Sequence, residues 1–368
     1  MRYSKTPTTI VFCFYLVLLL GPVFAQEPAR SQVRGKLVEI KVPAPALKGN
    51  LLGDPVEQPV SVYFPPSYDA SPSKRYPVLY LLHGYGGSNR TWSTDSPRSF
   101  SVGPIMDAVI AAGRGREMIV VAPNARNAFN GSFYTNSPVT GNWEDYIFQD
   151  IVRHIDANYR TLARPASRGI AGHSMGGYGA VAIGMKHPEV FSAIYALSPC
   201  CLGMEGDFNE ANPGWARLAT FTSRDQLPKF SSLDDFYTNV FSALSAAFSP
   251  NVDRAPFYSD LLFREQNGKL ERVEVASAKW KAKMPLYMVA DHKQNLLGLR
   301  GIFLDYGQNE EFSHIRIATS LLSKSLSEHG VPHMFEIYAG GDHSNKIKER
   351  VETKLINFFS ERLEFTDR

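Results

Sequence analysis

Short apolar runs alternate along the chain with segments in which apolar residues recur at helical spacing. The runs at 76–84 and 117–125 are mostly apolar, which is typical of strands buried in a parallel sheet. Between 142 and 159, apolar residues recur at every fourth position and predict a helix. The same pattern predicts further strands at 36–45, 59–68, 167–174, 191–199, 299–307 and 333–341, and further helices at 104–113, 175–188, 313–330 and 345–363.

This alternation of strands and helices predicts βαβ units, and hence an α/β fold with a mostly parallel central sheet and helices on both faces. The rhythm is lost from about Cys201 to Lys283, where aromatic residues and Pro are frequent and one helical pattern occurs at 233–248. We interpret residues 202–283 as a cap inserted between strands, with ordinary peripheral packing as the alternative. Residues 26–368 are therefore expected to form a single domain.

The first 25 residues have the order of a secretory signal peptide. Arg2 and Lys5 precede an apolar run at 10–20, and small residues lead up to Ala25. A membrane anchor is the alternative, but the run is shorter than the roughly 20 residues needed to span a bilayer. We therefore expect cleavage after Ala25, no stable membrane insertion afterwards, and a secreted or periplasmic protein.

Composition and charge narrow the possible function classes. The 368 residues are 44% hydrophobic and 20% charged, which suits a globular protein with a sizeable core. The net charge is only +3 and no basic run is interleaved with aromatic residues, so we expect no nucleic-acid partner. Phosphate-loop and metal-site motifs are lacking, so we expect no metal and no other cofactor. Cys200 and Cys201 are adjacent and cannot build a disulfide framework, although a strained vicinal disulfide stays open.

The stretch GIAGHSMGGYGA at 169–180 contains the pattern G-x-S-x-G around Ser174. A predicted strand precedes Ser174 and a predicted helix follows it, which is the setting of a nucleophile elbow. Gly172 and Gly176 would let the backbone approach closely around a strained serine. A plain strand–helix turn is the alternative reading of the same residues.

A nucleophilic serine needs a base and an orienting carboxylate, which follow it along the chain in this kind of fold. His343, in AGGDHSNK after the last predicted strand, fits the base by position. Glu310, just past the preceding strand, fits the acid, while four other carboxylates remain alternatives: Asp291, Asp305, Glu311 and Asp342. Asp291 is a candidate because it follows MPLYMVA at 284–290, a possible short strand.

Ester chemistry also needs N–H donors for the oxyanion that develops on the carbonyl oxygen. The backbone N–H of Met175, directly after Ser174, is one expected donor. The second is expected from the loop LLHGYGGSNRTW, where Tyr85 follows His83 and Gly84.

These motifs together resemble the putative esterase family of the α/β-hydrolase superfamily. Four stretches carry the resemblance: PVLYLLHGYGGS, the segment at 131–161, SRGIAGHSMGGYGA and GVPHMFEIYAGGDH. The family includes feruloyl esterases, S-formylglutathione hydrolase (esterase D), enterochelin-esterase-like proteins and mycolyltransferases. The resemblance implies that Ser174 is the nucleophile and His343 the base. At the position of Glu310 relatives usually have Asp, so the carboxylate is kept and its reach is longer.

The sequence therefore predicts an exported serine carboxylesterase that acts on a small-molecule or glycan-linked ester. Two alternatives remain: an acyltransferase of the mycolyltransferase type, and a catalytically silent binding protein on the same fold. The acyl group, the alcohol and the oligomeric state stay open at this level.

Overall fold

The computed structural model describes residues 1–4, 34–97 and 99–365. The chain divides into two units, Met1–Val33 and Arg34–Arg368, and all the helices and strands described below belong to the second. The predicted signal peptide falls almost entirely on residues outside the described ranges, so its structure is not discussed. Among the described residues, no helix is both long and apolar enough to cross a membrane.

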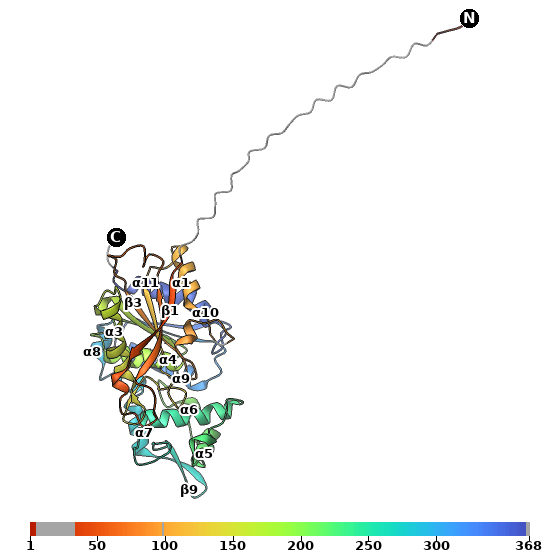
Figure 1. Ribbon diagram of the computed structural model, residues 1–368. Coiled ribbons are helices and arrows are strands. Elements are labelled where there is room, and N and C mark those ends of the chain that lie inside the picture. Colours follow the sequence, from red (N-terminus) through yellow and green to blue (C-terminus); the bar gives the residue numbers. More distant parts are fainter. Residues whose placement is uncertain (5–33, 98, 366–368) are drawn as a thin grey trace. The chain divides into compact units, whose positions relative to one another are not determined.

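One sheet organises the second unit, and eight strands of the described residues form it (Figure 1). From β4 onward neighbouring strands are parallel, whereas β1 and β2 join the sheet in antiparallel pairing. The predicted α/β fold with a mostly parallel sheet is thereby confirmed. In spatial order the strands are β1 (Lys36–Pro43), β2 (Glu57–Phe64), β4 (Ile119–Pro123), β3 (Val78–Leu82), β7 (Arg168–His173), β8 (Ala193–Leu197), β11 (Gly301–Gly307) and β12 (Met334–Tyr338).

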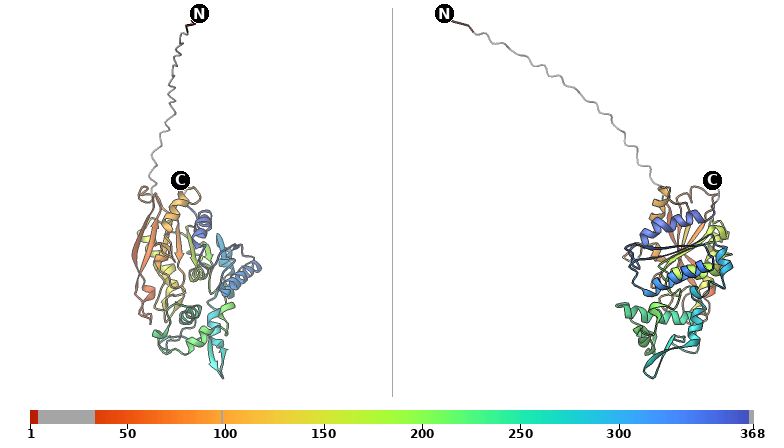
Figure 2. Two further views of the ribbon diagram at one scale, coloured as in Figure 1. Left: turned by 90° about the vertical axis from the view of Figure 1, so that its right-hand side faces the viewer. Right: turned by 180° about the vertical axis from the view of Figure 1, so that it is seen from behind.

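Helices cover both faces of this sheet, as the second view shows (Figure 2). Successive residues of β3 belong to two different hydrophobic clusters: Tyr80 belongs to the first cluster and Leu81 to the second. Because successive strand side chains point to opposite faces, each cluster fills one side of the sheet. The second cluster includes α1 (Val102–Ala111) and α11 (Ile356–Arg362), and the first includes α3 (Val152–Asn158), α4 (Met175–Lys186) and α9 (Ser313–Glu328). Short helical pieces α2 (Trp143–Asp145) and α10 (Ile347–Arg350) precede π-helical segments at Tyr146–Ile151 and Val351–Leu355.

The chain between β8 and β11, which we call the β8–β11 insertion (198–300), contributes no strand to the main sheet. The predicted cap at 202–283 lies within it. Figure 1 shows its green and cyan elements gathered below the sheet. They include α5 (Pro213–Ala219), α6 (Leu233–Phe248), a hairpin of β9 (Phe263–Gln266) and β10 (Lys269–Arg272), and α7 (Glu274–Lys281). The last helix of the insertion, α8 (Lys293–Leu297), instead packs against α4.

The possible strand at 284–290 does not form. The run MPLYMVA forms no strand, and instead Pro285–Tyr287 is a short 3₁₀ helix. Pro285 occupies its first turn, where the missing N–H costs nothing. Tyr287 is exposed, so the apolar run is not a core strand.

Candidate active site

Ser174 lies at the junction between β7 and α4, in a backbone conformation that is rare for a residue with a side chain. Its φ is 56° and its ψ is −117°. Such backbone strain costs about 1–3 kcal/mol and persists only where the surrounding structure enforces it. Here the Ser174 N–H donates to the Leu197 carbonyl at 3.0 Å, and the Ser174 carbonyl accepts from the N–H of Cys200 at 3.2 Å. The end of strand β8 and the segment that follows it therefore hold the N–H and the carbonyl of the serine in place.

Two glycines make this sharp turn possible. A Cβ atom on Gly172 would lie 2.4 Å from the carbonyl oxygen of Gly176, and one on Gly176 would lie 2.3 Å from that of Leu82. Both distances are far inside van der Waals contact with rigid backbone, so a larger residue would push the first turn of α4 away from β7 and β3. The glycines thus fix where Ser174 stands above the sheet edge.

His343 and Glu310 meet in the two loops that follow the last two strands. The Nδ1 atom of His343 lies 2.9 Å from Oε2 of Glu310, and the Glu310 side chain has no exposed surface. The other oxygen, Oε1, accepts from the backbone N–H of Phe312 at 3.2 Å. A buried carboxylate with this geometry fixes the Nδ1–H tautomer and leaves Nε2 of His343 available as a base.

The backbone of His343 is held from two further directions. Its N–H donates to Oε2 of Glu311 at 3.0 Å, and its carbonyl lies 2.8 Å from Nε2 of His173. Burial, and then the nearby His343, lower the pKa of His173 well below its usual value, so His173 is neutral and its Nε2–H donates this bond. The sequence had suggested no such contact for His173 or Glu311.

The other candidate acids lie elsewhere. Asp305 is fully buried on β11 and accepts from Arg350 at 2.7 and 3.0 Å and from the Tyr195 hydroxyl at 2.7 Å, which makes it part of a structural ion pair. Asp291 is exposed. Asp342 accepts from the backbone N–H groups of Ser344 and Asn345, both at 2.7 Å, and so shapes its own loop. The structure therefore brings only Glu310, of the five carboxylates, to the His343 ring.

Among the described residues, no hydrogen bond joins the Ser174 hydroxyl to His343. Such contacts are often long in unliganded hydrolases and tighten when substrate binds. Ser174, Glu310 and His343 nevertheless follow β7, β11 and β12, and the carboxyl ends of these parallel strands lie at one edge of the sheet.

The two expected oxyanion donors stand on either side of Ser174. Met175 is the first residue of α4, so its N–H has no partner within the helix. Tyr85 follows Gly84, where a Cβ would be only 3.4 Å from the Cβ of Ser174, so the loop passes directly over the serine. Within the described ranges, the N–H of Tyr85 donates to no protein group.

A buried histidine supports this loop. Burial lowers the pKa of His83 to about 4, so its ring is neutral. Nδ1–H donates to the Gly84 carbonyl and Nε2 accepts from the Ala125 N–H, both at 2.8 Å. Its own carbonyl accepts from the Tyr134 hydroxyl at 2.9 Å. These bonds hold the segment that carries Tyr85 against the Ser174 elbow.

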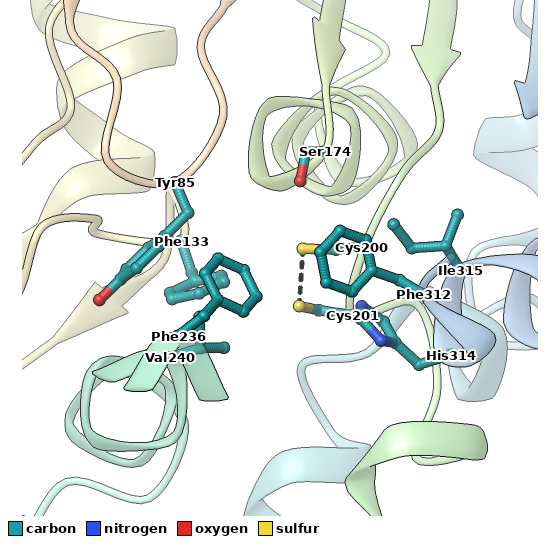
Figure 3. Close-up of a pocket in the computed structure, with 10 residues that line it drawn as sticks. All are labelled: Tyr85, Phe133, Ser174, Cys200, Cys201, Phe236, Val240, Phe312, His314 and Ile315. Atoms are coloured by element: carbon teal, nitrogen blue, oxygen red, sulfur yellow. Dashed lines mark hydrogen bonds between the residues drawn. The ribbon is translucent and has the colours of Figure 1, made fainter. Parts of the chain in front are cut away.

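A pocket opens beside Ser174, and its walls are largely aromatic (Figure 3). Tyr85 and Phe133 stack at a ring-centroid distance of 5.8 Å, and Phe236 of α6 meets Tyr85 edge-on. In the same view Cys200 and Cys201 lie below Ser174, with Phe312 on the side away from Tyr85. The full lining is Tyr85, Phe133, Ser174, Cys200, Cys201, Phe236, Val240, Phe312, His314 and Ile315. Over the part of the chain that the structure describes, no group of three or more His, Cys, Asp or Glu could hold a metal ion.

Comparison with known proteins places the chain in a family. Residues 55–349 match the family described as Putative esterase. An esterase of Mycobacterium tuberculosis is 35% identical over 139 residues, which are 36% of this chain and 27% of that protein. An endo-1,4-β-xylanase/feruloyl esterase of Xylanibacter ruminicola is 34% identical over 142 residues, 36% of this chain and 18% of that protein. The matched stretch thus spans less than a third of the length of these curated relatives.

Solved structures agree on the fold. A ferulic acid esterase superposes with a TM-score of 0.60 at 21% identity, over 90% of this chain and 100% of that one. The predicted α/β-hydrolase fold and the predicted family resemblance are both confirmed. The two curated relatives are named as an esterase and as an endo-1,4-β-xylanase/feruloyl esterase. The chain belongs to the Putative esterase family.

Proposed function

We propose that this protein hydrolyses a carboxylic ester through Ser174, His343 and Glu310. The observation that carries the proposal is the strained Ser174 elbow at the same sheet edge as a histidine whose Nδ1 is bonded to a fully buried carboxylate. A binding protein would have no need of this arrangement, since strain and a buried charge both cost stability.

In the first half-reaction, Nε2 of His343 takes the Ser174 proton as the hydroxyl oxygen attacks the ester carbonyl. The carbonyl oxygen becomes an oxyanion, and the N–H groups of Met175 and Tyr85 donate to it. Glu310 stabilises the imidazolium that forms. His343 then protonates the leaving alcohol, and an acyl-enzyme remains. In the second half-reaction, His343 activates water, which releases the acid and restores Ser174.

The pocket favours an ester with a flat, apolar acyl group. Aromatic rings stack best against other rings, and the lining offers the faces or edges of Tyr85, Phe133, Phe236 and Phe312. Two of the relatives compared above are named for feruloyl or ferulic acid ester hydrolysis. We therefore infer that the substrate is an ester of an aromatic carboxylic acid, either free or linked to a glycan.

Activity on a panel of esters tests this proposal. With methyl ferulate, a medium-chain acyl glyceride and S-formylglutathione at matched concentrations, kcat/KM should be highest for methyl ferulate.

Phe236→Ala should lower kcat/KM for methyl ferulate by about 10-fold, because a stacked ring contributes about 0.5–1.5 kcal/mol beyond its buried area. The same variant should keep kcat/KM for 4-nitrophenyl acetate within about twofold of the wild type. Equal loss on both esters would contradict the acyl-group assignment. Acyl product on added glycerol in excess of free acid would identify a transferase instead.

We also propose that the protein is exported and cleaved after Ala25. The charged start, the apolar run at 10–20 and the small residues before Ala25 support this. N-terminal sequencing of protein from the native host should begin at Gln26. A cytoplasmic protein that keeps Met1 would contradict export and leave the ester chemistry untouched.

A further inference from the structure

The pocket holds two thiols that ester hydrolysis does not use. Cys200 and Cys201 are free and line the pocket together with Ser174 (Figure 3). The N–H of Cys200 donates to the Ser174 carbonyl, so the two residues are directly joined through the backbone. A Cβ on Gly177 would lie 2.9 Å from Pro199, which shows how tightly this loop packs on the first turn of α4. Cys200 is therefore fixed beside the proposed nucleophile.

Two groups approach the sulfur of Cys200. The Cys201 thiol donates to it at an Sγ–Sγ distance of 2.7 Å, and the ring of His314 lies beside the two thiols in the same pocket wall (Figure 3). The ring nitrogen Nδ1 of His314 lies 2.8 Å from Oδ2 of Asp207. Cys200, His314 and Asp207 are thus arranged as a thiol, a histidine and an orienting carboxylate, which is the arrangement that activates a cysteine.

The orienting carboxylate is itself firmly placed. Asp207, in the β8–β11 insertion, also accepts from the Ser313 hydroxyl at 2.7 Å and from the His314 N–H at 3.0 Å, at the start of the 16-residue helix α9. Gly206, with φ 65°, permits this approach, because a Cβ there would meet the His314 nitrogen at 2.6 Å. The ring of His314 is buried against Phe208 at a centroid distance of 4.6 Å. Nothing in the ester mechanism requires this second ion pair.

We propose that Cys200 is a second nucleophile of the pocket, a thiolate paired with His314 and Asp207, and that it is a modification site for uncharged α,β-unsaturated carbonyl compounds whose β-carbon is unsubstituted, unlike the aryl-substituted β-carbon of a ferulate ester. The sulfur attacks the β-carbon and forms a C–S bond, and the C=C π pair moves toward the carbonyl. His314 donates its proton to the resulting enolate at the α-carbon. The net change adds S–H across the double bond, with no oxidant or reductant. A thiolate is a soft nucleophile, and the apolar aromatic walls admit flat, neutral molecules of this class.

The electrostatics of the pocket agree with this assignment. Burial alone raises the pKa of Cys200, but the hydrogen bonds from Cys201 and His314, together with the charges of His314 and His343, lower it to about 6. Burial likewise opposes charge on His314, and its bonds to Asp207 and Cys200 outweigh burial and raise its pKa. The pKa of Cys201 is raised, first by burial and then by Cys200, so Cys201 stays a thiol. Tyr237 of α6 is the further titratable group near Cys201 and Asp207.

Acrylamide is a suitable probe because it is small, neutral and α,β-unsaturated. Treated briefly at pH 7, the folded protein should gain one adduct, and peptide mass mapping should place it on Cys200. The Cys201→Ser variant is the matched control and should still be modified, whereas Cys200→Ser should not. Adduct on Cys201, or none on the folded protein when the denatured protein reacts, would overturn the proposal. Circular dichroism confirms that each variant is folded.

The pH profile separates activation from mere exposure of the sulfur. In the wild type the rate of modification should rise with pH and level off above about 6, because the thiolate reacts and the thiol does not. Asp207→Asn keeps the shape and removes the charge behind His314, so the midpoint should move upward by about one pH unit. An unchanged midpoint would leave Cys200 as an ordinary accessible thiol and contradict the proposal.

Modification should also block the pocket. Acrylamide treatment should abolish most ester hydrolysis by the wild type, whereas Cys200→Ser should have the same activity before and after treatment. Prior reaction of Ser174 with a bulky phosphonate should slow modification of Cys200. The adduct assay needs no ester hydrolysis, so it stands even if the proposed function fails. Conversely, an active esterase with an unreactive Cys200 would refute only this inference.

Discussion

Ser174→Ala is expected to lower kcat/KM for methyl ferulate by about 10⁴- to 10⁶-fold, because the acyl-enzyme can no longer form. The residual rate would come from oxyanion binding and substrate orientation alone. The backbone at this position is equally strained for Ser and Ala, since both carry a Cβ, so stability should change little. A fluorophosphonate probe should label the wild type on Ser174 and leave the variant unlabelled.

The control for this variant is Ser344→Ala, which removes an exposed hydroxyl directly after His343. Its activity should stay within about twofold of the wild type, since surface substitutions of this kind rarely matter. Full activity in Ser174→Ala, or probe attached to another serine, would mean that the elbow is structural and that the proposed esterase mechanism is wrong.

Glu310→Gln is expected to lower kcat/KM by about 10²- to 10⁴-fold while the fold persists. The amide keeps the shape of the side chain but loses the charge that stabilises the imidazolium, and it can turn the His343 ring to the wrong tautomer. The loss should fall mainly on kcat, because Glu310 acts through His343 and touches no substrate. Steady-state kinetics on one ester measure both parameters.

The neighbouring Glu311→Gln variant provides a matched comparison. Within the described part of the chain, Glu311 bonds only to the backbone N–H of His343, and it is exposed, so its loss should cost less than about tenfold. Asp291→Asn should be nearly silent, since that side chain lies on the surface. If Glu311→Gln or Asp291→Asn proves more damaging than Glu310→Gln, the orienting acid has been assigned to the wrong residue.

The main sheet could be predicted because its strands are short, nearly continuous apolar runs. Strands buried on both faces leave such runs, and β3, β4, β7 and β8 all lie within the predicted ranges. The position of Ser174 at a strand–helix junction followed from the same pattern. The run MPLYMVA could be read as a strand because a short apolar run does not distinguish a strand from a half-exposed turn. Pro285 favours the first turn of a helix, and a 3₁₀ turn forms there.

The second reactive group could not be predicted in the same way. Asp207 and His314 are separated by 107 residues, and Asp207 lies in a segment without regular periodicity. Their contact depends on how the insertion folds over α9, which no local pattern encodes. The adjacent thiols were visible in the sequence, but the position of His314 beside them was not.

The β8–β11 insertion has a consequence for how the proposed activity could be altered. Its two ends are fixed by adjacent paired strands, and it supplies Phe236 and Val240 to the pocket, while Glu310 and His343 come from outside it. Changing the length of a segment whose ends are fixed costs little entropy, about 0.6 kcal/mol for each doubling. The acyl pocket can therefore be reshaped by grafting a different α6 region, with the reacting groups left in place on the sheet edge.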